Sequence, residues 1–177
     1  AKEGEKKGGK IIYHGGQQVS LAPWQGKASG TTMVIKDLFY NTPARLKFIK
    51  SQQSERNALK RMLSSFILAN PKVTFTIKWD DKDKEFYPGL TRSDPKSMEE
   101  RVRKVLFTKK SENTELIYFE GQYEGHKAQG YISRFSNRSP SGKSHFLFAN
   151  RRVFQDKALH KAVINTAERL WGPGETG

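Results

Sequence analysis

Residues 30–50 read GTTMVIKDLFYNTPARLKFIK, and the prediction of the fold starts from this stretch. Met33 to Phe39 is largely apolar and β-branched, which predicts a strand. Thr42 followed by Pro43 is typical of a helix start. The threonine hydroxyl can accept a hydrogen bond from a backbone N–H, and proline gives up an N–H that has no partner at this position. We therefore expect a strand that runs into a capped helix, with Arg45 adding positive charge to that helix.

The identities of these residues say more than a strand–helix junction requires. Gly30-Thr31-Thr32, the predicted strand and LFYNTPARLKF at 38–48 together resemble the signature of the MutL family of DNA mismatch-repair ATPases. MutL proteins begin with a GHKL-type ATPase domain, a layer of helices on a mixed sheet, followed by a smaller transducer domain that resembles domain two of the ribosomal-protein-like superfamily. The resemblance implies an α+β fold, with 1–90 as the latter part of the ATPase domain and 91–177 as the first part of the transducer.

The remaining pattern is consistent with a mixed fold. Gly15-Gly16 predicts a hairpin turn, and apolar residues at helical spacing predict a helix from about 54 to 69. Asp94-Pro95 and Asp156 each mark the start of a later helix. Residues 88–94 combine proline, glycine and polar residues, which favours a domain boundary. Strands are expected at 73–79, 85–87, 116–119, 122–124, 128–135 and 145–149.

Charge is the strongest global clue to function. The 177 residues include 32 Lys+Arg and 18 Asp+Glu, a net charge of +14. A strongly basic protein usually meets nucleic acid, an anionic membrane or an acidic partner, and no stretch reads as a basic amphipathic or membrane-spanning helix. Cysteine is absent, which excludes disulfides, cysteine-based zinc sites and a thiol nucleophile. The composition therefore favours nucleic acid as the partner.

The excess of positive charge is concentrated between Arg134 and Arg169. This region holds eight basic residues against Asp156 and Glu168, a net charge of +6. Contacts to phosphate need positive charge along a surface rather than a base-reading geometry, so they predict salt-sensitive binding with little sequence preference. On composition alone, a merely soluble basic face explains the charge equally well. The basic residues are Arg134, Arg138, Lys143, Arg151, Arg152, Lys157, Lys161 and Arg169.

A second block within this region again resembles the MutL family. FLFANRR at 146–152, followed by Gln155-Asp156-Lys157, looks like the corner of the family in which a strand ends before a helix. In the family this corner belongs to the positively charged face implicated in DNA binding. The resemblance makes Arg152 the best candidate, while Arg151 occupies a position where many relatives have glycine. The predicted DNA-binding residues are Arg152, Arg151, Lys157, Lys161, Arg138 and Arg45.

The resemblance implies little nucleotide chemistry within these 177 residues. The family's catalytic glutamate, magnesium-binding asparagine, adenine motif and lid lie upstream of the matched blocks, and its transducer lysine lies downstream. Only Thr31 matches a nucleotide-binding position, where the family's threonine helps to hold adenine. We expect ATP and magnesium to bind the intact protein, and expect no cofactor, no catalytic or metal-binding residue and no ATP hydrolysis for this chain alone.

The resemblance also implies the wider function and the partners. An intact MutL-type protein binds ATP, closes a homodimer, engages double- or single-stranded DNA and couples mismatch recognition to strand processing. Its partners are a mismatch-recognition protein and other repair proteins, without a membrane, in a bacterial, nucleoid-associated cytoplasmic setting. Two alternatives remain: a basic nucleic-acid-binding module without ATPase coupling, and another GHKL relative such as a topoisomerase subunit or a chaperone.

Overall fold

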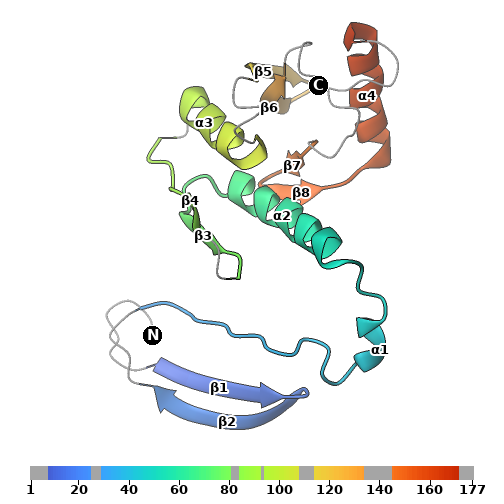
Figure 1. Cartoon of the computed structure of the whole chain (residues 1–177). Helices are drawn as coiled ribbons and strands as arrows, with labels where there is room; N and C mark the ends of the chain where they lie inside the picture. Colours follow the sequence, from blue (N-terminus) through green and yellow to red (C-terminus); the bar gives the residue numbers. More distant parts are fainter. Residues whose placement is uncertain are drawn as a thin grey trace. The chain divides into compact units, whose positions relative to one another are not determined.

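The computed structural model describes residues 8–24, 29–80, 84–92, 94–107, 114–133 and 145–171, with side chains up to residue 166. In this part of the chain, every strand pairs antiparallel with its neighbour in sequence, so β1–β2, β3–β4, β5–β6 and β7–β8 are four hairpins (Figure 1). Helices lie between the first three hairpins and after the last one, and the α+β fold class is confirmed. The elements are β1 (Gly8–His14), β2 (Gln17–Trp24), α1 (Pro43–Leu46), α2 (Gln52–Ala69), β3 (Phe75–Lys78), β4 (Lys84–Tyr87), α3 (Pro95–Leu106), β5 (Leu116–Tyr123), β6 (His126–Ser133), β7 (Leu147–Ala149), β8 (Arg152–Phe154) and α4 (Lys157–Trp171).

The chain forms two compact units, Ala1–Glu55 and Arg56–Gly177. The first contains β1, β2, α1 and the start of α2, and the second contains the rest. These units are clusters of contacts within the chain and do not test the family-based domain boundary near residue 90, which stays a prediction.

The predicted strand Met33–Phe39 is wrong for this structure. Residues 31–36 carry no regular secondary structure, and a turn follows at 37–41. Met33 and Ile35 are 80% and 68% exposed. A strand needs a neighbour that satisfies its backbone hydrogen bonds, and no described strand pairs with this segment. The apolar pattern reports which side chains favour burial, but it does not supply the pairing partner.

The helix start at Pro43 is confirmed, but the predicted cap is not. α1 has a single turn with Pro43 in its first position, and Thr42 occupies the N-cap without a side-chain hydrogen bond. The backbone of Thr42 has ψ 57°, away from the extended conformation that normally aims a capping hydroxyl at the N–H groups of the next turn. Its carbonyl oxygen instead accepts from the N–H of Arg45 at 2.9 Å. The hydroxyl of Thr42 therefore does not stabilise α1.

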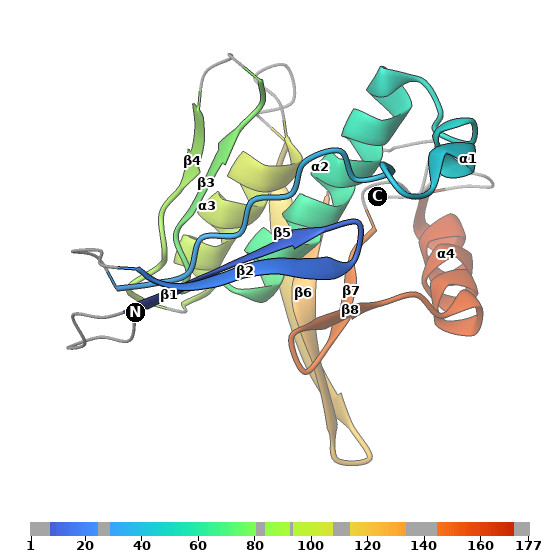
Figure 2. The ribbon, with the colours of Figure 1, turned by 90° about the horizontal axis from the view of Figure 1, so that it is seen from below.

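The second unit has a small core where α2 meets α3. Figure 2 shows these helices side by side, with the β5–β6 hairpin extending beyond them. The most buried apolar side chains are Ile67 and Leu68 of α2 and Val102 of α3, with exposed fractions of 1%, 6% and 8%. Burial of these three side chains holds the helix pair together. Leu59, Met62 and Phe66 also recur at helical spacing in α2 but are 46%, 48% and 52% exposed, so only part of its apolar face is buried.

The two helix starts predicted in the second unit are confirmed, and an aspartate caps each of them. Asp94 precedes Pro95 and accepts a hydrogen bond from the N–H of Ser97 at 3.0 Å. This bond is the main reason that the pKa of the Asp94 carboxyl lies below its usual range. Asp156 caps α4 in the same way, accepting from the N–H of Leu159 at 2.7 Å. Both caps satisfy backbone donors that have no partner inside the helix.

Candidate nucleic-acid interface

The β7–β8 hairpin presents two arginines, Arg151 in its turn and Arg152 at the start of β8. Ala149 pairs with Arg152, which leaves Asn150 and Arg151 as the two residues of the turn. Their φ angles are 48° and 66°, the left-handed values that a tight turn between twisted strands requires. Asparagine tolerates this conformation, but a longer L-residue such as arginine adopts it at a cost. The turn therefore carries a cation at a position where glycine is favoured.

Both arginines of this hairpin are exposed. A hollow of about 230 Å³ lies beside them, lined by Ser65, Phe66, Ala69, Asn70, Arg151, Arg152 and Val153. Ser65, Phe66 and Ala69 of this lining lie in the last turns of α2, and Asn70 directly follows the helix. The carboxyl end of a helix carries partial negative charge, which favours nearby cations. Within the described residues no carboxylate lies within ion-pair distance of Arg151 or Arg152.

α4 adds two further cations on the next element of the chain. Lys157 is its first residue, and Lys161 lies one turn later on the same face. Both are exposed, and no described carboxylate pairs with either. The amino end of a helix carries partial positive charge, so a lysine at Lys157 is electrostatically unfavourable for the helix itself. Arg151, Arg152, Lys157 and Lys161 are called the cationic face below.

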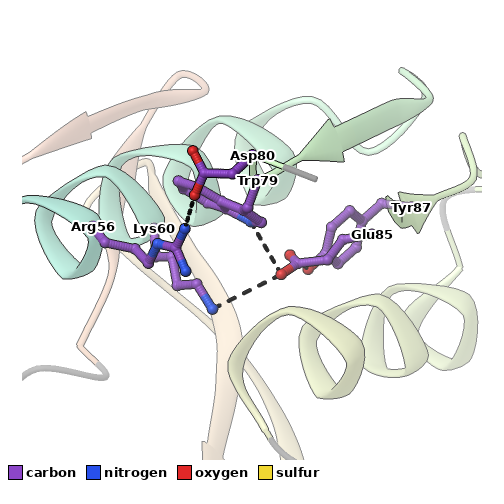
Figure 3. Close-up of polar contacts among 6 residues, drawn as sticks. All are labelled: Arg56, Lys60, Trp79, Asp80, Glu85 and Tyr87. Carbon is purple, nitrogen blue, oxygen red and sulfur yellow. Dashed lines mark hydrogen bonds and ion pairs between the residues drawn. The ribbon is translucent and has the colours of Figure 1, made fainter. Parts of the chain in front are cut away.

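The basic residues of α2 are in a different situation, shown in Figure 3. Arg56 pairs with Asp80 at 2.5 Å, and Lys60 lies 3.8 Å from Glu85. Both cations also lie over the ring of Trp79, at 5.4 and 5.7 Å from its centroid. Their charges are thus partly compensated within the protein, and they attach the β3–β4 hairpin to α2.

Glu85 connects several side chains in this contact between α2 and the β3–β4 hairpin. Its carboxylate accepts from Nε1 of Trp79 at 3.1 Å and from the hydroxyl of Tyr87 at 3.0 Å (Figure 3). Burial, followed by the bond to Glu85 and the charge of that carboxylate, raises the pKa of Tyr87 to about 12. The polar groups of these side chains form hydrogen bonds with one another, which indicates a structural role rather than a ligand site.

The other predicted site residues lie elsewhere. Thr31 is exposed in the irregular segment after Gly30, and Arg45 is exposed in the last turn of α1; both belong to the first unit. Arg138 lies outside the described residues, as do Arg134 and Lys143. The second unit therefore places four of the six predicted DNA-binding residues on consecutive elements.

Arg61 contributes to this region and was not singled out from the sequence. Its Nη2 donates to the carbonyl oxygen of His145 at 3.1 Å, and its guanidinium lies 4.9 Å from the ring centroid of Phe146. Both contacts hold the segment that enters β7 against α2. The partners are 84 positions apart in the sequence, so no local pattern could have revealed them.

Two further features are absent from the described residues. No group of three or more His, Asp or Glu side chains is arranged there to hold a metal ion. No helix in that part of the chain is long and apolar enough to cross a membrane.

Sequence comparison finds relatives among mismatch-repair proteins, although no family model matches the chain. The chain is 34% identical over 156 residues to the DNA mismatch repair protein MutL of Elusimicrobium minutum, covering 88% of the chain and 25% of that protein. It is 33% identical over 159 residues to MutL of Clostridium botulinum, covering 89% and 22%. The chain thus spans about a quarter of the length of these curated relatives.

Solved structures agree with the sequence relatives. The MutL ATPase domain of Aquifex aeolicus in complex with ADP is similar with a TM-score of 0.65 and 26% identity, over 91% of this chain and 58% of that one. The N-terminal domain of a DNA repair protein, at 18% identity and a TM-score of 0.66, shares the fold. The α+β fold is therefore that of MutL ATPase domains, which are of the GHKL type. On this evidence the chain belongs to the MutL family of DNA mismatch repair proteins.

Proposed function

We propose that the cationic face binds DNA through phosphates, as part of a protein that acts in mismatch repair. The observation that carries the proposal is the set of four exposed cations on the β7–β8 hairpin and α4, with no described carboxylate paired to any of them. Such a surface attracts the phosphate backbone without reading the bases.

The positions of two of these cations support the proposal. Arg151 is held in a left-handed conformation, and Lys157 lies at the positive end of a helix dipole. The left-handed conformation of Arg151 destabilises the β7–β8 turn, and the charge of Lys157 destabilises α4. Residues that violate local structural preferences often mark functional sites, because the cost is then offset by binding. Arg56 and Lys60 differ from these cations because carboxylates of the protein compensate their charges, and this contrast also supports a binding role for the cationic face.

The wider activity is proposed from the relatives. The similar A. aeolicus structure is an ADP complex, which supports nucleotide binding by the intact protein, with magnesium held by residues outside this sequence. Thr31 is the one proposed nucleotide contact here, and 1–90 and 91–177 are the proposed ATPase and transducer parts. ATP binding and hydrolysis drive dimerisation and DNA engagement, which couple recognition of a mismatch by a partner protein to strand processing. The expected setting is the bacterial cytoplasm, in association with the nucleoid.

The cationic face is tested by charge reversal. Fluorescence anisotropy measures the affinity of the chain for two duplexes of unrelated sequence, with wild type and Arg152→Glu. We expect the affinity for both duplexes to fall by a similar factor, because a phosphate contact is replaced by repulsion. Lys84→Glu is the matched control, since it makes the same charge change at an exposed residue of β4. Equal losses in the two variants mean that only net charge matters; loss on one duplex alone means that Arg152 reads bases.

A further inference from the structure

The segment that the sequence marks as a domain boundary is tied to the rest of the second unit. The N–H of Leu90 donates to the carbonyl oxygen of Pro71 at 2.8 Å, and the N–H of Gly89 donates to Oγ1 of Thr74 at 2.9 Å. Both acceptors lie in the connection between α2 and β3. Residues 88–90 thus run against this connection instead of forming a loose linker.

Gly89 allows this close approach of two backbone segments. A Cβ atom at this position would lie 2.4 Å from the carbonyl oxygen of Lys72 and 3.3 Å from the backbone nitrogen of Thr74. Real side chains do not come so close to backbone atoms, so any other residue forces the two segments apart. The obstacle is backbone, which cannot move aside as a flexible side chain can.

Arg101 of α3 joins the same segments from within. It is only 4% exposed, and its guanidinium donates to carbonyl oxygens on both sides of the β3–β4 hairpin. A buried guanidinium is costly unless its donors are satisfied, and this one has four acceptors. They are the carbonyl oxygens of Ile67 at 3.0 Å, Pro88 at 2.5 Å, Val73 at 3.0 Å and Asn70 at 3.4 Å.

We propose that Gly89 and Arg101 form a rigid joint that makes the parts of the second unit before and after residue 90 move as one body. The two are positioning residues: they hold α3 against the end of α2 and fix the path of the chain between them. The assignment of these parts to an ATPase and a transducer domain rests on the proposed function. If 1–90 and 91–177 are these two domains, the joint makes the transducer follow a nucleotide-driven movement of the ATPase domain as a rigid body. The contacts of the joint themselves depend only on the structure.

Hydrogen exchange of the full chain tests the joint, read by mass spectrometry on the peptide that contains the amides of Gly89 and Leu90. In the wild type these amides are expected to exchange about as slowly as those of α3. In Arg101→Met and in Gly89→Ala they are expected to exchange faster by roughly tenfold, the factor that corresponds to about 1.4 kcal/mol. Arg101→Lys should fall in between, because an ammonium cannot reach all four acceptors.

The controls separate loss of the joint from loss of stability. Val102→Ala removes a buried side chain next to Arg101, and Gly121→Ala adds a methyl group where no atom lies within 4 Å. The variants are compared at urea concentrations that give them the same free energy of unfolding. Under these conditions, only Arg101→Met and Gly89→Ala should speed exchange of the amides of residues 89 and 90. The proposal is overturned if Arg101→Met and Val102→Ala exchange alike under this match, or if the wild-type amides exchange as fast as an unfolded peptide. DNA affinity is not part of the readout, so failure of the Arg152 experiment leaves this result intact.

Discussion

Replacing Arg151 by glycine should make the protein more stable while it weakens DNA binding. The φ angle of 66° at Arg151 lies in the left-handed region, which costs a non-glycine residue about 1–2 kcal/mol. Glycine removes this cost but adds about 0.5–1 kcal/mol of chain entropy in the unfolded state. The difference is a net gain of roughly 0.5–1 kcal/mol for Arg151→Gly. With a urea m-value of about 1–3 kcal/mol per M, the unfolding midpoint should rise by roughly 0.3 M.

Arg152→Gly is the matched control for this experiment. It removes the same charge one residue later, but Arg152 lies in β8 and is not among the residues with positive φ. Glycine there weakens the strand by about 0.5–1 kcal/mol, so the midpoint should fall. Urea unfolding followed by circular dichroism measures both variants, and anisotropy measures their affinity for DNA. A lower midpoint in both variants would show that the left-handed turn does not strain Arg151, and the stability cost assigned to this cation would have to be withdrawn.

Three further changes probe α4, α3 and the β3–β4 hairpin. Lys157→Gln should raise the thermal midpoint, because it removes a cation from the positive end of α4, and should weaken DNA binding; a lower midpoint or an unchanged affinity would contradict this. The pKa of Asp94 is lowered in the folded state, so its carboxylate stabilises the fold above the ordinary pKa of 3.8, and this stabilisation is lost as the pH falls through the folded-state pKa. Asp94→Asn should therefore make the free energy of unfolding, measured by urea titration, less dependent on pH in this acidic range, while it keeps the helix cap at neutral pH. Burial and the bond to Glu85 raise the pKa of Tyr87 from 10.0 to about 12, so the stability that its neutral form contributes is complete below pH 10 and is lost as the pH rises to about 12; Tyr87→Phe should remove this part of the alkaline loss, and an unchanged alkaline loss of stability would argue against a raised pKa of Tyr87.

The sequence predicted best those features that depend on neighbours along the chain. Asp94 and Asp156 cap the helices they precede, and Pro43 starts a helix, because each effect involves residues within one turn. The end of the strand before Asn150 and the start of α4 were predicted from their residues, and the left-handed φ of Arg151 agrees with the glycine expected there from the resemblance. β8, which carries Arg152, was not predicted, and the role of the cationic face in DNA binding stays a prediction.

Features that depend on distant partners were missed. The stretch from Met33 has the composition of a strand, but a strand forms only where another chain segment pairs with it. Arg101 reads as a polar position of an amphipathic helix, yet it is buried because carbonyl oxygens up to 34 positions away converge on it. Gly89 was interpreted as part of a domain boundary, which stays a prediction, and the close backbone contact that it makes was not foreseen. A single sequence carries no signal for such convergence.

The salt dependence of DNA binding tests the central claim most directly, namely that the cationic face holds phosphates. The affinity of wild type and Arg152→Glu for one duplex is measured by anisotropy across a series of salt concentrations. The account predicts a steep linear fall of log K with log salt for the wild type, and a slope shallower by about 0.9 for each phosphate contact that Arg152→Glu removes. An unchanged slope with unchanged affinity would contradict it, because Arg152 would then face solvent or another protein surface rather than DNA.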